Sequence, residues 1–142
     1  MWRKLRRLGV AQLADGLVAL PEDARTREQL DWIAEEVLAA DGAAMLWSAQ
    51  PAAIGDERRI AGQLSADRTK EYAELTARAM EACAAPPAER RRALRGLRTE
   101  LRAVRRRDYF SADGKHAATR ALAILAQAVV DEPATDPERA QP

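Results

Sequence analysis

Arginine side chains dominate residues 90–107, and they recur at spacings typical of one helix face. The stripe consists of Arg91, Arg95, Arg98, Arg102 and Arg105, and Arg106 follows it directly. A guanidinium group keeps its charge at physiological pH and forks onto the oxygens of phosphates and other oxyanions. The stripe therefore predicts a surface that binds the DNA backbone or gathers oxyanions.

The alternative is that these arginines pair with carboxylates. Only Glu89 and Glu100 lie nearby in the sequence. More distant candidates exist, and they are Glu28, Glu35, Glu36, Glu71 and Glu74. The pairing could also be with another chain, so a homodimer or a partner-docking module without nucleic-acid binding remains open at this point.

Residue types that support catalysis are scarce. The single histidine, His116, and the single cysteine, Cys83, lie in different predicted helices, and nothing in the sequence brings them together as base and nucleophile. One histidine and one cysteine do not form a metal-ligand cluster, and no glycine-rich phosphate loop is present. We expect no enzyme, no metal and no cofactor, with Cys83 as a small core residue.

Three helices are expected to carry these side chains. The first spans 56–84 and is either one long helix or two, with Gly62 and Ser65 marking the weak point at which it could break. In the second, 88–107, an apolar seam runs beside the arginines; it consists of Leu94, Leu97, Leu101 and Val104. The third spans 115–130, with a cap at Ser111 or Asp113.

The first 50 residues predict a small sheet. A basic helix over 1–8 ends at Gly9, and two apolar runs flank Asp15-Gly16, a strong hairpin signal. Pairing Ala14 with Leu17 places Leu13 opposite Val18 and Ala11 opposite Leu20. A capping box at Thr26 opens a helix that ends at Asp41-Gly42, and the run 43–48 predicts a third strand.

The fold class expected is therefore α+β. A three-stranded sheet of incomplete ferredoxin-like type, lacking its first strand, is covered by two helices and followed by about three more helices. The expected divisions are 1–50, a helical portion at 55–131, and a disordered, proline-rich and acidic tail at 132–142. Aromatic side chains are few, so we expect them in the core; they are Trp2, Trp32, Trp47, Tyr72, Tyr109 and Phe110.

Composition narrows the cellular setting. The formal net charge is only +1, but basic residues concentrate near the start and in the arginine-rich segment. One cysteine cannot form an internal disulfide, and no apolar run is long enough to span a bilayer. We expect a cytoplasmic protein without a membrane partner.

The order of several short motifs resembles the N-terminal domain of ChrB-type chromate-resistance proteins. The motifs are Leu8-Gly9, Asp15-Gly16, Leu20-Pro21, 26–28 (Thr-Arg-Glu) with Trp32, Asp41-Gly42, Asp67-Arg68, Glu71-Tyr72 and 108–110 (Asp-Tyr-Phe). The resemblance covers roughly residues 2–130. That domain is in turn distantly similar to a ferredoxin-like domain shared by a phenylacetate-pathway repressor and a CRISPR-associated nuclease.

The resemblance implies a chromate-resistance regulatory or accessory protein that binds DNA or a chromate- or sulfate-like oxyanion through the arginine-rich helix. Longer members of the family carry a second domain, so a separate protein supplying that domain is a further possible partner. The family usually has a strand before the basic helix, whereas this chain starts inside that helix. Nuclease activity is not carried over, because the nuclease keeps its acidic residue at the end of that strand. Chromate reduction by Cys83 is a third hypothesis.

Overall fold

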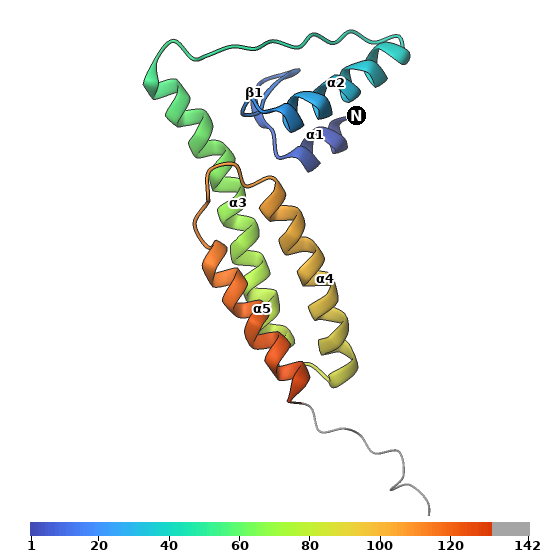
Figure 1. Ribbon diagram of the computed structural model, residues 1–142, viewed down its shortest axis with the longest axis vertical. Helices are drawn as coiled ribbons and strands as arrows, with labels where there is room; N and C mark the ends of the chain where they lie inside the picture. The colour runs from blue at the N-terminus through green and yellow to red at the C-terminus, as the bar shows by residue number, and fades with distance from the viewer. Residues whose placement is uncertain (132–142) are drawn as a thin grey trace, which may run out of the picture. The chain divides into compact units, whose positions relative to one another are not determined.

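The computed structural model describes residues 1–131, and helices make up most of them. The elements in chain order are α1 (Trp2–Leu8), β1 (Ala11–Ala14), β2 (Leu17–Ala19), α2 (Ala24–Ala39), α3 (Ile54–Ala82), α4 (Pro87–Arg106) and α5 (Lys115–Val130) (Figure 1). They form two compact units. The first, unit 1, comprises Met1–Arg68 and Arg106–Ala112, and the second, unit 2, comprises Thr69–Arg105 and residues 113–131.

In unit 1, α1 and the hairpin follow the sequence prediction closely at their turns. Gly9 ends α1 with φ 73° and donates its N–H to the carbonyl of Arg6. Gly16 has φ 75° in the two-residue hairpin turn, the left-handed conformation that glycine adopts without steric strain. The pair Ala14 and Leu17 is confirmed.

Beyond that first pair, the predicted hairpin register is wrong. The ladder is irregular between Gln12 and Ala14, so Val18 pairs with Gln12, and Ala11 pairs with Ala19. An irregularity of this kind places an extra residue on one strand and moves every later pair by one position.

The predicted fold class, α+β with a three-stranded ferredoxin-like sheet covered by two helices, is also wrong, because the described residues are mostly helical. The sheet of residues 1–131 has two strands, and residues 43–48 run in an irregular conformation. Met45 and Trp47 are 79% and 78% exposed. The hairpin strands are only four and three residues long and rich in alanine, so they offer little apolar surface against which a third strand could pack.

Helix α2 begins three residues earlier than the capping box at Thr26 predicts. Its N-cap is Asp23, whose carboxylate accepts from the backbone N–H of Thr26 (2.8 Å), while the Thr26 hydroxyl lies 3.1 Å from the Asp23 backbone N–H. The hydrogen bond from the Thr26 backbone N–H holds the pKa of the Asp23 carboxyl below its usual value. The helix ends before Asp41, which adopts φ 56°.

Unit 2 contains the later part of α3 with α4 and α5, which lie side by side (Figure 1). Its buried core includes Tyr72, Leu75, Ala79, Leu94, Leu97, Leu101, Val104, Ala118, Ala121, Leu122 and Leu125. The apolar seam on α4 is thus confirmed. α3 continues through Gly62 and Ser65 without a break. The predicted cap at Ser111 or Asp113 is wrong, because Gly114 is the N-cap of α5 and no side chain caps it.

The aromatic side chains divide between the core and the surface. Tyr72 is fully buried and Tyr109 is half-buried, whereas Phe110 is 48% exposed. Trp2, Trp32 and Trp47 are exposed as well. A core location was therefore the wrong prediction for Phe110 and all three tryptophans. The predicted tail 132–142 lies outside the described residues.

Candidate nucleic-acid interface

The buried seam of α4 determines where its arginines point. At about 100° per residue, the arginine stripe faces a direction roughly 100° away from the seam. We call this stripe the α4 ridge; it consists of Arg91, Arg95, Arg98, Arg102 and Arg105, all of them exposed. Eight arginines and two glutamates lie within α4, so the helix has a large local positive charge despite the nearly neutral chain.

Most of the ridge is not engaged by carboxylates. Within residues 1–131, no ion pair involves Arg95, Arg98 or Arg102. Arg102 donates to the hydroxyl of Thr99 (3.4 Å) on its own helix. Arg105 donates to Thr119 of α5 (2.6 Å). Hydroxyl groups leave the positive charge of a guanidinium uncompensated, so the ridge remains a cationic surface.

The carboxylates of α4 lie on the opposite flank of the seam. Glu100 receives two hydrogen bonds from Arg78 of α3, one of them 2.8 Å long between Nη2 and Oε1. This fork lowers the pKa of Glu100 and raises that of Arg78. Glu89 projects to the same flank as Glu100, because eleven residues complete about three turns. The local carboxylates therefore do not neutralise Arg95, Arg98 or Arg102.

One neighbour in the basic segment has a structural role that the sequence did not reveal. Arg90 is half-buried and donates to the carbonyl of Ala128 in the last turn of α5 (2.8 Å) and to that of Ala85 (3.0 Å). The last four carbonyls of a helix have no intrahelical partner. Arg90 thus ties the α3–α4 turn to the end of α5 and is not part of the ridge.

Arg106, the last predicted site residue, is exposed but belongs to unit 1. Its carbonyl accepts from Arg25 (2.8 Å), whose guanidinium lies 5.9 Å from the ring centroid of Tyr109. Tyr109 donates to the carbonyl of Leu8, the last residue of α1 (2.8 Å). Burial raises the pKa of Tyr109, although the charge of Arg25 opposes that effect. This network anchors residues 106–109 to the first two helices.

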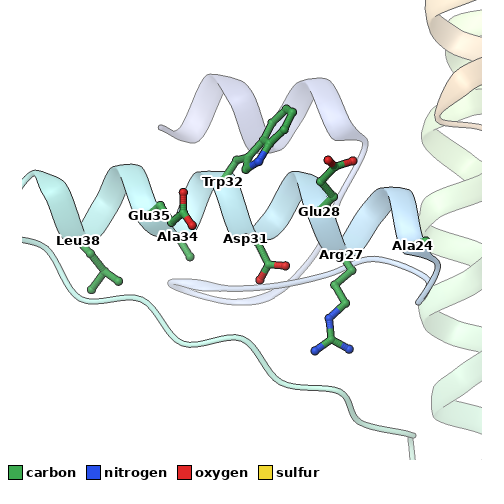
Figure 2. A pocket seen from close by; sticks show the side chains of 8 residues that line it. All are labelled: Ala24, Arg27, Glu28, Asp31, Trp32, Ala34, Glu35 and Leu38. Carbon is green, nitrogen blue, oxygen red and sulfur yellow. The ribbon is translucent and has the colours of Figure 1, made fainter.

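A second surface of opposite charge lies on α2. A shallow hollow is lined by eight residues of this one helix, which are Ala24, Arg27, Glu28, Asp31, Trp32, Ala34, Glu35 and Leu38 (Figure 2). A hollow on a single helix does not enclose a small molecule, since ligand pockets are concave and bury most of their ligand. Glu35 and Glu28 were foreseen only as partners of arginines. Their spacing with Asp31 was the signal for this surface.

The described residues offer neither a metal site nor a membrane-spanning helix. Within residues 1–131, no three His, Cys, Asp or Glu side chains lie together in a way that could hold a metal ion. No helix in this range combines the length and the apolarity that crossing a membrane requires. Cys83 is half-buried just beyond α3, where its thiol contacts the carbonyl of Ala79 (3.3 Å).

Comparison with known proteins decides the family. A family model described as "Protein ChrB, N-terminal" matches residues 1–85. The chain belongs to the ChrB family. This family assigns the chain a role related to chromate resistance. The ChrB match covers α1, the hairpin, α2 and α3, and it ends before α4 begins. No curated protein and no solved structure matches the chain.

Proposed function

We propose that this ChrB-family chain acts in chromate resistance as a regulatory or accessory protein that binds duplex DNA through the α4 ridge, without catalysis. The observation that supports this most strongly is the exposure of Arg95, Arg98 and Arg102 in one row, without an ion pair among the described residues. Phosphate contacts of this kind supply most of the affinity in sequence-independent DNA binding.

The shape of the ridge favours a polyanion over a single oxyanion. From Arg91 to Arg105 the ridge extends about 21 Å along the helix, at about 1.5 Å per residue. A chromate- or sulfate-like oxyanion needs guanidinium groups that converge on one point. A row on a convex helix instead spreads its charges along a line, which suits the regularly spaced phosphates of a nucleic-acid backbone.

The composition of α4 favours a duplex with little sequence preference. The helix contains no aromatic residue, and single-stranded binding sites usually stack bases on aromatic side chains. It also lacks asparagine and glutamine, which read adenine in the major groove. Any base readout by the ridge itself therefore depends on arginine contacts with guanine.

A salt titration with ridge variants tests this function. We expect the full chain to bind a mixed-sequence duplex of about 30 base pairs with a strong salt dependence, since each neutralised phosphate contributes about −0.9 to the slope of log K against log salt. Replacing Arg95, Arg98 and Arg102 together by alanine should reduce the magnitude of that slope by about 3. Fluorescence anisotropy measures it.

The matched control removes three exposed arginines outside the ridge, Arg27, Arg58 and Arg120. This variant has the same change in net charge and should keep nearly the native slope. Equal slopes in the two triple variants would refute binding through the ridge.

A further inference from the structure

The outer face of α2 carries three carboxylates in a row, which we call the α2 acidic stripe: Glu28, Asp31 and Glu35. All three are exposed, and within residues 1–131 none of them lies in a hydrogen bond or an ion pair. The stripe lies roughly opposite the side of α2 that carries Thr26 and Ile33, at about 100° per residue. It is therefore a solvent-facing surface with no function in holding α2 in unit 1.

Apolar side chains border the stripe. Trp32 and Leu38 are 61% and 56% exposed, and both line the hollow together with the carboxylates (Figure 2). An exposed tryptophan beside carboxylates is a suitable receptor for arginine, because the guanidinium both forks onto a carboxylate and stacks on an indole ring.

We propose that the α2 acidic stripe docks the α4 ridge of a second copy of this chain. The carboxylates are spaced by three and four residues, and Arg95, Arg98 and Arg102 have the same spacings. When the charges on two helices have the same spacing, the helices can align so that three oppositely charged pairs form along the line of contact. The inference uses the ridge of the proposed function but holds whether or not the ridge binds DNA.

The other basic element of the chain fits the stripe less well. α1 has seven residues and no row of arginines at the required spacing. Its Lys4 already pairs with Glu36 of α2 (2.7 Å to Oε2), and its Arg6 stacks over Trp2. The ridge of a second copy is longer and its central arginines are not engaged by carboxylates in the described chain, so it is the better complement. Docking there would compete with DNA for the same guanidinium groups.

A charge-swap experiment on the full chain tests the proposal by sedimentation velocity at about 50 mM salt, where screening is modest. One variant reverses the stripe with Glu28→Lys and Glu35→Lys, and another reverses the ridge with Arg95→Glu and Arg102→Glu. We expect the native chain to self-associate and each variant alone to associate about tenfold or more weakly, since like charges then face each other. An equimolar mixture of the two variants should recover association.

The control variant, Asp67→Lys with Glu81→Lys, changes the net charge equally at exposed positions of α3 and should associate like the native chain. The proposal is overturned if the native chain is monomeric or if either reversed variant associates as strongly as the native chain. It is also overturned if the mixture stays monomeric while both variants keep their native helical circular dichroism. DNA binding is scored separately. The stripe variant retains the ridge and should still bind the duplex, whereas a native chain that binds the duplex without self-association rejects this inference alone.

Discussion

The two units of the chain are stabilised in different ways. In unit 2, leucine and alanine side chains from three helices are buried against one another, including Leu97 and Leu125 at 2% and 0% exposure. In unit 1, large apolar side chains such as Leu17, Trp32 and Trp47 are mostly exposed. Unit 1 relies instead on polar contacts such as the Asp23 capping box and the Tyr109–Leu8 hydrogen bond.

This difference explains how each unit presents charge. A well-packed seam fixes the orientation of α4, so the ridge is a preorganised row of guanidinium groups. Unit 1 leaves apolar and acidic side chains of α2 uncovered together, which is the composition of a docking surface. In the two proposals above, unit 2 therefore supplies the anion-binding surface and unit 1 supplies the surface for a second copy of the chain.

The largest expected effect concerns the core of unit 2. Leu97→Ala should lower the free energy of unfolding by about 2–5 kcal/mol, because it leaves a cavity in the seam. Leu17→Ala in unit 1 should change it by less than about 0.5 kcal/mol, as for other exposed positions. Urea unfolding followed by circular dichroism measures both. Equal losses would contradict the contrast between the units.

Substitutions of α4 arginines should differ in their effect on stability, depending on whether the arginine is Arg90 or lies in the ridge. Arg90→Ala removes two hydrogen bonds to backbone carbonyls and should destabilise the chain by about 1.5–3 kcal/mol, as for hydrogen bonds from charged groups. Arg95→Ala, a ridge control, should stay within about 0.5 kcal/mol of the native chain. Thermal unfolding of the pair tests this, and a neutral Arg90→Ala would disprove the tethering role.

In unit 1, the capping box should dominate the stability of α2. Asp23→Ala should lower the free energy of unfolding by about 1 kcal/mol, whereas Asp31→Ala on the exposed face should have little effect. Because the folded pKa of Asp23 is lowered, its contribution is present above its unfolded pKa near 3.8. It is lost as the pH falls through the lower folded pKa. The difference between Asp23→Ala and the native chain should therefore shrink in acid, and a constant difference down to the lowest pH would count against the cap.

The smallest effect should appear at alkaline pH. The folded pKa of Tyr109 is raised above its usual value of 10.0, so the folded chain keeps the phenol proton after the unfolded chain has lost it. Stability from this group is complete below pH 10 and is lost as the pH rises through the folded pKa. Tyr109→Phe should weaken the alkaline loss measured by urea unfolding, with Tyr72→Phe as a comparison. An unaltered alkaline profile in Tyr109→Phe would rule out this contribution.

Local signals predicted several elements correctly. The first and last residues of α5 were predicted correctly, and Gly9 and Gly16 lie at the turns where they were expected. The buried seam of α4 was predicted from the spacing of its apolar residues. These features depend on residues close together in the sequence, where helical periodicity and glycine conformation act directly. The exposure of the ridge follows from the same periodicity, because a buried seam leaves its flank in solvent.

Some errors are local, such as the hairpin register and the caps of α2 and α5. The other errors concern contacts between distant residues and the cover of exposed faces. The run 43–48 is apolar, but whether it pairs as a strand depends on the surface that the hairpin offers. Arg90 has the same residue type as its ridge neighbours, but it lies at helical spacing from Leu94 on the seam side of α4. Its hydrogen bonds to Ala128 and Ala85 give it a structural role. Trp32 was expected in the core because aromatic residues are few, yet it is exposed on α2; the helical spacing of Leu30 and Ile33 places it away from their face.

The central claim is the proposal that the α4 ridge binds DNA through Arg95, Arg98 and Arg102. Its most direct test is a titration of the full chain with duplex DNA followed by NMR of the arginine Nε–Hε signals. We predict that the signals of Arg95, Arg98 and Arg102 shift, while those of Arg78 and Arg90, which bind their own chain, do not. Ridge signals that stay unmoved at saturating duplex would contradict the account.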